Sequence, residues 1–164
     1  FVPGHVCDRL KDSRGAGVCG SPQFFMRKLI KYALTEAEAE TIRTVQMMQF
    51  DHPLVERMVN AIKNAAPDAA ITPKSYARVE YKADGHDWHT DQGDRGHMKW
   101  CAYSGSVLLT NEFAGGNLEF ADGTKHRHYL DLLIFSSDER HRVLPHGGGR
   151  RVALLIFLGR ENGE

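Results

Sequence analysis

The chain has 164 residues, of which 41% are hydrophobic and 26% charged, and its 21 basic residues balance its 21 acidic residues. This length suits one domain, residues 1–164, and leaves too little chain for two ordinary domains. A formal net charge of zero argues against general binding to nucleic acid. The longest apolar run, residues 152–158, is too short to cross a bilayer, and the N-terminus lacks the layout of a signal peptide.

Helical signals gather in the N-terminal part of the chain, residues 1–70. We expect a short helix at Val6–Lys11, and Thr35 with Glu38 has the spacing of a capping box before a second helix. A longer helix is predicted from Pro53, because apolar residues recur after it at helical spacing. Its apolar positions are Leu54, Val55, Met58, Val59 and Ile62.

From Ser75 onward the chain changes to short runs of strand-forming residues separated by turn residues, which is typical of an antiparallel β domain. The pattern predicts a mainly β fold, built as a double-sheet roll or barrel with the N-terminal helical layer packed on it. The predicted strands are residues 75–81, 88–91, 106–110, 117–120, 132–136 and 152–158.

The three cysteines, Cys7, Cys19 and Cys101, include no C-x-x-C pair. An odd number without that spacing argues against a disulfide framework, so we expect reduced thiols. Together with the missing signal peptide, this predicts a soluble cytoplasmic protein with no membrane partner. The sequence does not specify an oligomeric state.

The residues His89-Thr90-Asp91 end one of the predicted strands, and His141 follows later in the chain. Side chains at i and i+2 of a strand leave on the same face, so His89 and Asp91 can bind one metal ion together. Two imidazoles and one carboxylate suit iron(II), and a set of three ligands leaves coordination positions open. These three residues are the candidate metal ligands and catalytic residues.

Further motifs accompany this H-x-D sequence in a fixed order. They are Tyr81 and Gly85 before His89, GGNLEF at residues 115–120, FSS at residues 135–137, and then His141, Val143, Pro145 and Arg151. In this order they resemble the iron(II) and 2-oxoglutarate dependent dioxygenases, in particular the prolyl 4-hydroxylase-like branch, over residues 72–160. An isolated H-x-D is weak evidence, whereas an ordered set rarely arises by coincidence.

The resemblance implies a double-stranded β-helix (jelly roll) core over residues 72–160 and an enzyme that uses Fe(II), 2-oxoglutarate as cosubstrate and O2, with ascorbate as a reductant. The implied reaction hydroxylates an unactivated C–H bond and releases succinate and CO2. The implied partner is a prolyl or related residue in a peptide or protein, or a small molecule, and not nucleic acid.

Within this resemblance, Arg151 is the candidate for binding the distal carboxylate of 2-oxoglutarate, because a guanidinium stays charged and offers a planar pair of donors. Arg150 is the alternative, and it should point to the opposite face of the strand. The family has a small residue two positions after its basic residue, here Ala153, which favours Arg151. Tyr81 lies eight positions before His89, where the family often directs a phenol into the cosubstrate pocket; the alternative is a half-buried strand tyrosine.

The chain departs from the family pattern near the expected carboxylate site. Leu109 stands near the position of a tyrosine that often helps to bind the distal carboxylate. Thr110 or Tyr103 is the candidate to supply the hydroxyl instead. Phe157 stands where the family often has tryptophan. Because of these departures, the resemblance indicates the type of reaction more clearly than the identity of the substrate.

Three other interpretations remain open at this point. His126, His128 and Asp131 form a second pattern with metal-binding side chains, although the simpler interpretation places both histidines at a polar edge between strands. The same chemistry on a nucleobase would draw on local basic residues such as Arg142 and Arg160, but zero net charge weakens it. A β-roll protein that retains a metal without catalysis is the third.

Overall fold

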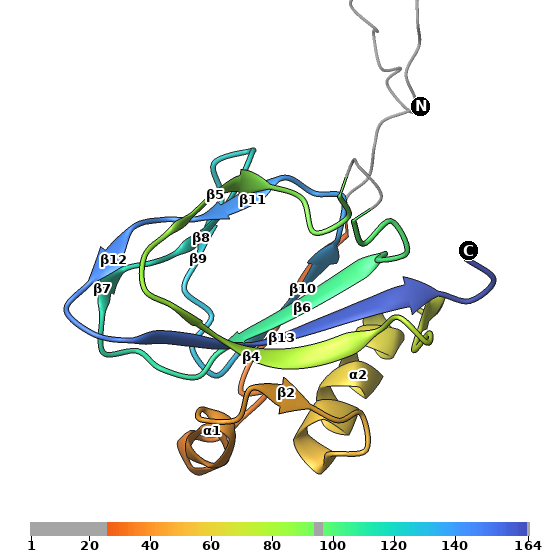
Figure 1. The fold of residues 1–164 in the computed structure, drawn as a ribbon, viewed down its shortest axis with the longest axis horizontal. Coiled ribbons are helices and arrows are strands. Elements are labelled where there is room, and N and C mark those ends of the chain that lie inside the picture. The colour runs from red at the N-terminus through yellow and green to blue at the C-terminus, as the bar shows by residue number, and fades with distance from the viewer. Residues whose placement is uncertain (1–25, 94–96, 164) are drawn as a thin grey trace, which may run out of the picture.

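The computed structural model describes residues 26–93 and 97–163. They form three layers: a small antiparallel sheet, a large antiparallel sheet, and two helices on the outer face of the large sheet (Figure 1). The helix expected at Val6–Lys11 lies outside the described residues, as do Cys7 and Cys19. Within the described ranges, no helix is long and apolar enough to span a membrane.

The large sheet has seven strands, with β13 near its centre. Six of them follow the order β1-β10-β6-β13-β4-β2, and β3 pairs with β13 beside this path. All of these pairings are antiparallel. The strands are β1 (Arg27–Ile30), β2 (Met47–Met48), β3 (Ala69–Ala70), β4 (Tyr76–Lys82), β6 (Tyr103–Leu108), β10 (Leu132–Ser136) and β13 (Arg151–Arg160).

The small sheet faces the large sheet from the side opposite the helices (Figure 1). Its order is β5 (His86–His89), β11 (His141–Val143), β8 (Leu118–Phe120) and β9 (Lys125–His126), and β7 (Ala114–Gly115) pairs with β12 (His146–Gly147) in a separate ribbon. Apolar side chains from both sheets pack together between them: Leu118, Phe120, Leu133, Phe135 and Val143. The predicted mainly β, double-sheet fold is confirmed.

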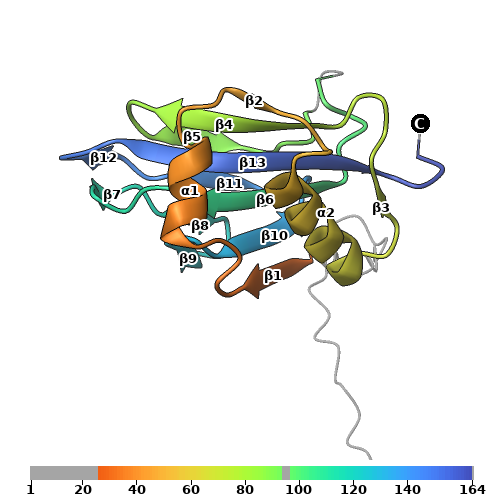
Figure 2. The ribbon, with the colours of Figure 1, turned by 90° about the horizontal axis from the view of Figure 1, so that it is seen from below.

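The two helices form where the sequence predicts them. Helix α1 (Glu36–Ile42) begins at a capping box in which the Thr35 hydroxyl accepts from the Glu38 amide, and the Glu38 carboxylate accepts from the Thr35 amide. Helix α2 (Pro53–Ala65) buries its predicted apolar stripe against the large sheet, and His52 caps its N-terminus. Both helices lie across the same face of the sheet (Figure 2).

The N-terminal part is not only helical, which corrects the predicted layer. It also contributes β1, β2 and β3 to the large sheet. β2 and β3 have only two residues each, and β1 reads Arg-Lys-Leu-Ile, so none of them carries an alternating pattern long enough to recognise.

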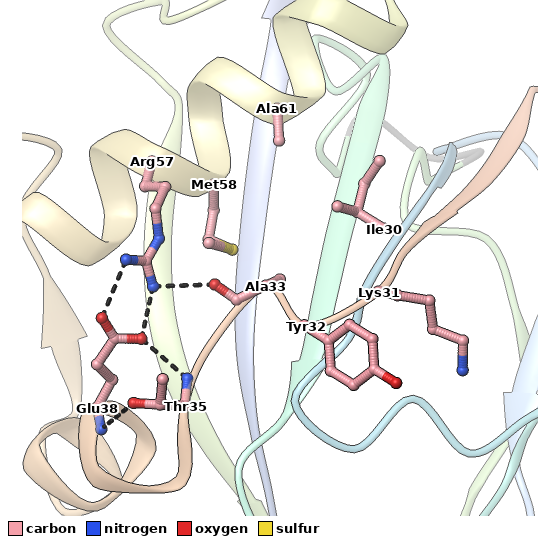
Figure 3. A pocket seen from close by; sticks show the side chains of 9 residues that line it. All are labelled: Ile30, Lys31, Tyr32, Ala33, Thr35, Glu38, Arg57, Met58 and Ala61. Carbon is pink, nitrogen blue, oxygen red and sulfur yellow. Dashed lines mark hydrogen bonds and ion pairs between the residues drawn. The ribbon is translucent and has the colours of Figure 1, made fainter.

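An ion pair ties α1 to α2 beside a surface pocket of about 350 Å³ (Figure 3). The Arg57 guanidinium donates to both carboxylate oxygens of Glu38, at 3.0 and 2.6 Å, and to the carbonyl oxygen of Ala33 at 2.9 Å. Glu38 thus serves both as a helix cap and as the partner of Arg57. This arrangement fixes α1 relative to the longer helix.

Replacing Ile62 by alanine should lower the free energy of unfolding by about 3 kcal/mol, because it leaves a cavity at the contact between α2 and β6. Ile62 is fully buried, and a Cβ atom at Gly105 would lie only 2.9 Å from its Cδ1 atom. Asn64→Ala, at an exposed position of the same helix, is the matched control and should change stability by less than about 0.5 kcal/mol. Equal urea-denaturation midpoints for the two variants would contradict this packing role.

Candidate active site

The structure brings His89, Asp91 and His141 together in one group. His89 ends β5, Asp91 follows two residues later, and His141 opens β11, where it pairs directly with His89. One ligand atom from each residue lies within 4.8 Å of the others, and this is the only such group of three among residues 26–93 and 97–163. The Asp91 Oδ1 atom is 3.6 Å from the Nε2 atom of each histidine.

Both imidazole rings are oriented by backbone carbonyls. His89 Nδ1 lies 2.7 Å from the carbonyl oxygen of Asp87, and His141 Nδ1 lies 2.9 Å from that of Glu139. A carbonyl oxygen only accepts, so each Nδ1 carries a proton, and in the neutral ring Nε2 presents a lone pair toward Asp91. Two lone pairs beside a carboxylate oxygen repel one another unless a cation lies between them. The donor set therefore fits a divalent metal such as Fe(II).

The charges at the site favour a cation. Burial by itself would raise the pKa of Asp91, but contacts with His141, His89 and Ser104 outweigh it and hold that pKa well below its usual range. Burial lowers the pKa of His89, but its interactions with Asp91 and the Asp87 carbonyl outweigh burial, so the net pKa is raised. The carboxylate is thus ionised at neutral pH, as a metal ligand must be.

This group lies in a cavity of about 370 Å³ between the two sheets. Arg151 lines the same cavity; only 3% of it is exposed, and its Nε donates to the Gly116 carbonyl oxygen at 2.8 Å. Burial lowers the pKa of Arg151 to about 10, so the guanidinium stays charged at neutral pH. Leu155 and Phe157 follow it on the inner face of β13, as strand alternation predicts. The cavity therefore combines the group of His89, Asp91 and His141 with a buried cation.

Arg150 and Tyr81 lie together outside the cavity. The Arg150 guanidinium lies 4.4 Å above the Tyr81 ring, and Tyr81 is 52% exposed. The prediction that Tyr81 enters the cosubstrate pocket is wrong, because its neighbours Glu80 and Lys82 occupy the inner face of β4. The structure places Arg151, and not Arg150, at the cavity.

Neither hydroxyl suggested as a substitute at the carboxylate site reaches the cavity. The Thr110 hydroxyl donates to the Arg150 carbonyl oxygen at 2.7 Å, and the Tyr103 hydroxyl donates to Asp68 at 2.6 Å. Ser106 lines the cavity instead. Its hydroxyl lies 2.7 Å from Nε2 of His128, an interaction that sequence reasoning missed.

The second metal pattern is not assembled. His128 is buried beside Ser106, whereas Asp131 accepts from the Lys31 ammonium and the Tyr32 amide. Spacing alone suggested a shared site for His126, His128 and Asp131, but the turn after β9 directs His128 and Asp131 to different neighbours.

His128 predicts a pH dependence of stability. Burial, with the nearby charge of Arg151, lowers its pKa to about 3 from an ordinary value of 6.5. Between these values the unfolded chain binds a proton that the folded chain does not, so the free energy of unfolding falls as pH drops below 6.5. One such proton contributes up to about 1.4 kcal/mol per pH unit. Urea denaturation between pH 7 and pH 5 should show a shallower dependence for His128→Gln, and an unchanged slope would contradict the assignment.

Comparison with known proteins identifies the fold. No family model and no curated protein matches the chain. Among solved structures, it is similar to a 2OG-Fe(II) oxygenase family oxidoreductase from Burkholderia pseudomallei, with a TM-score of 0.62 and 15% identity over 84% of this chain and 85% of that one. The chain therefore has the double-stranded β-helix fold of the 2OG-Fe(II) oxygenases.

The particular structures it resembles include prolyl hydroxylases. A Pseudomonas putida prolyl-4-hydroxylase matches with a TM-score of 0.62 and 14% identity, over 83% of this chain and 93% of that one. A viral collagen prolyl hydroxylase from Paramecium Bursaria Chlorella virus-1, solved as a 2OG complex, matches with a TM-score of 0.62 and 16% identity, over 89% of this chain and all of that one. The predicted jelly-roll core is confirmed.

Proposed function

We propose that the chain is a 2-oxoglutarate and Fe(II) dependent dioxygenase that hydroxylates an unactivated C–H bond. The observation that carries the proposal is the group of His89, Asp91 and His141 in one cavity with the buried guanidinium of Arg151. A metal-binding group explains the three donors, and a dicarboxylate cosubstrate explains why a cation is buried near them.

Each of these side chains has a definite task in the proposal. His89 and His141 would hold the metal through Nε2, and Asp91 would hold it through Oδ1. Fe(II), when bound, would supply the redox chemistry that activates dioxygen in the presence of a keto acid. Arg151 would bind the distal carboxylate and so orient the keto acid. The overall reaction converts 2-oxoglutarate, O2 and R–H into succinate, CO2 and R–OH.

The substrate we propose is a prolyl or related residue in a peptide or protein. The solved prolyl hydroxylases of the same fold support this choice. A nucleobase substrate has less support, since Arg142 pairs with Glu119 and Arg160 with Asp68, which occupies two of the basic side chains that it would use.

The test is production of succinate and CO2 from 2-oxoglutarate, with Fe(II) and ascorbate present. We expect turnover that requires Fe(II), and a further increase when proline-rich peptides or free proline are added. Mass spectrometry should then find a gain of one oxygen atom in the peptide. Metal binding without any decarboxylation would instead support a β-roll protein that has no oxygenase activity.

A further inference from the structure

The two carboxylate oxygens of Asp91 have different surroundings. Oδ1 faces both histidines, at 3.6 Å from each Nε2. Oδ2 accepts a hydrogen bond of 2.6 Å from the hydroxyl of Ser104, which lies on β6 of the opposite sheet. One oxygen is thus directed to the proposed metal position, and the other is engaged by the protein.

The Ser104 hydroxyl belongs to a chain of buried groups. Its Oγ lies 2.9 Å from Oγ of Ser137, which lies 3.0 Å from Sγ of Cys101. Ser104 is 1% exposed, and Ser137 and Cys101 are completely buried. Water therefore does not compete for these hydrogen bonds.

The direction of the two hydroxyl hydrogen bonds in this chain follows from its carboxylate end. An ionised carboxylate only accepts, so the single hydroxyl proton of Ser104 points to Asp91. Ser104 can then only accept from Ser137, whose Oγ lies 3.0 Å from Sγ of Cys101; that thiol also lies 3.8 Å from the Tyr103 carbonyl oxygen. Burial raises the pKa of Cys101 to about 12, which keeps the thiol protonated and able to donate. The hydroxyls of Ser104 and Ser137 therefore both point toward Asp91 Oδ2.

We infer that Ser104 is a positioning residue that makes Asp91 a monodentate ligand through the hydrogen bond that its hydroxyl donates to Oδ2. This inference rests on the proposed function. A hydrogen bond to an ionised acceptor is stronger than a neutral one, and it must be broken before Oδ2 can turn to the metal. An aspartate bound through both oxygens would occupy an additional position. It would then compete with a keto acid that chelates through two atoms.

The inference predicts a selective effect on ligands that need two adjacent metal positions. Oxalate chelates through two oxygens, whereas azide binds through one atom, and neither carries a distal carboxylate for Arg151. In the full-length protein loaded with Co(II), Ser104→Ala should weaken oxalate binding about tenfold and azide binding less than about twofold. Both affinities can be measured from the visible absorption of Co(II).

Ser137→Ala is the matched control, because it removes a hydroxyl from the same chain but leaves the donor to Asp91 in place. It should bind oxalate nearly as the wild type does, and Ser104→Thr, which keeps a hydroxyl, should restore much of the loss. Thermal unfolding of the metal-free variants separates these effects from damage to the fold.

Two results would overturn the inference. One is an equal weakening of oxalate and azide in Ser104→Ala, which is the pattern of a purely structural role. The other is unchanged oxalate binding in that variant. If the wild type forms succinate with Fe(II) in either case, the proposed function survives and only the role of Ser104 is lost. A wild-type protein that binds no Co(II) or Fe(II) would refute the metal centre itself.

Discussion

Asp91→Ala should reduce Fe(II)-dependent formation of succinate by at least about a hundredfold, because it removes the only anionic donor of the proposed centre. Metal binding should weaken in parallel, since two neutral imidazoles alone must then hold a divalent cation. A second readout is thermal stability: Fe(II) or Co(II) should raise the melting temperature of the wild type and have little effect on the variant.

Asp138→Ala is the control for this experiment. Asp138 is exposed and precedes His141 by three positions, so its removal changes the same net charge without touching the metal-binding group. It should keep wild-type turnover and metal stabilisation. Full turnover by Asp91→Ala would contradict the ligand assignment.

Arg151→Ala should raise the apparent KM for 2-oxoglutarate on the order of a hundredfold, about 2.7 kcal/mol, with a smaller change in kcat. The reason is the loss of charge-assisted hydrogen bonds to the distal carboxylate inside a buried cavity. Inhibition by oxalate, which lacks that carboxylate, should change little.

Arg150→Ala is the neighbouring control, because its guanidinium stacks on Tyr81 outside the cavity. It should leave the KM for 2-oxoglutarate nearly unchanged. A rise in Arg150→Ala as large as that in Arg151→Ala would mean that both guanidinium groups bind the cosubstrate.

The parts of the fold that the sequence predicts are those with a local physical signal. The stripe of apolar residues after Pro53 defines α2, and the Thr35–Glu38 capping box marks the start of α1. The strand pattern after Ser75 corresponds to β4, β5, β6, β8, β10 and β13, with boundaries shifted by a few residues. The sequence does not predict the strands β1, β2 and β3, nor the short strands β7, β9, β11 and β12. Pairing with other strands stabilises them, and their own residues carry little pattern.

In the candidate site, too, the residues with a local signal could be predicted and the others could not. His89 and Asp91 both reach the cavity as expected, although β5 ends at His89 and Asp91 lies just beyond it. Strand alternation separates Arg151 from Arg150. The position of the Tyr81 side chain could not be predicted, because its spacing to His89 does not reveal which face of β4 turns inward. That face depends on the pairing of β4 with β13.

Ser104 and Ser106 could be found only after the sheets are placed. Two serines at i and i+2 of an otherwise apolar strand are weak evidence for a buried hydrogen-bonding site, since both lie on a face of the strand that is predicted to be buried. Their partners, Asp91 and His128, come from segments on either side of β6, and no spacing rule connects them. Long-range hydrogen bonds of this kind therefore cannot be predicted from the sequence alone.

The order of the donors along the chain has a consequence for biosynthesis. His89 and Asp91 leave the ribosome well before His141, and β13, which carries Arg151, emerges last of all the strands. Because β13 lies between β4 and β6, the large sheet cannot close before β13 has been synthesised. A polypeptide truncated before β13 would therefore keep His89, Asp91 and His141 but lack both the guanidinium of Arg151 and the strand that joins β4 to β6.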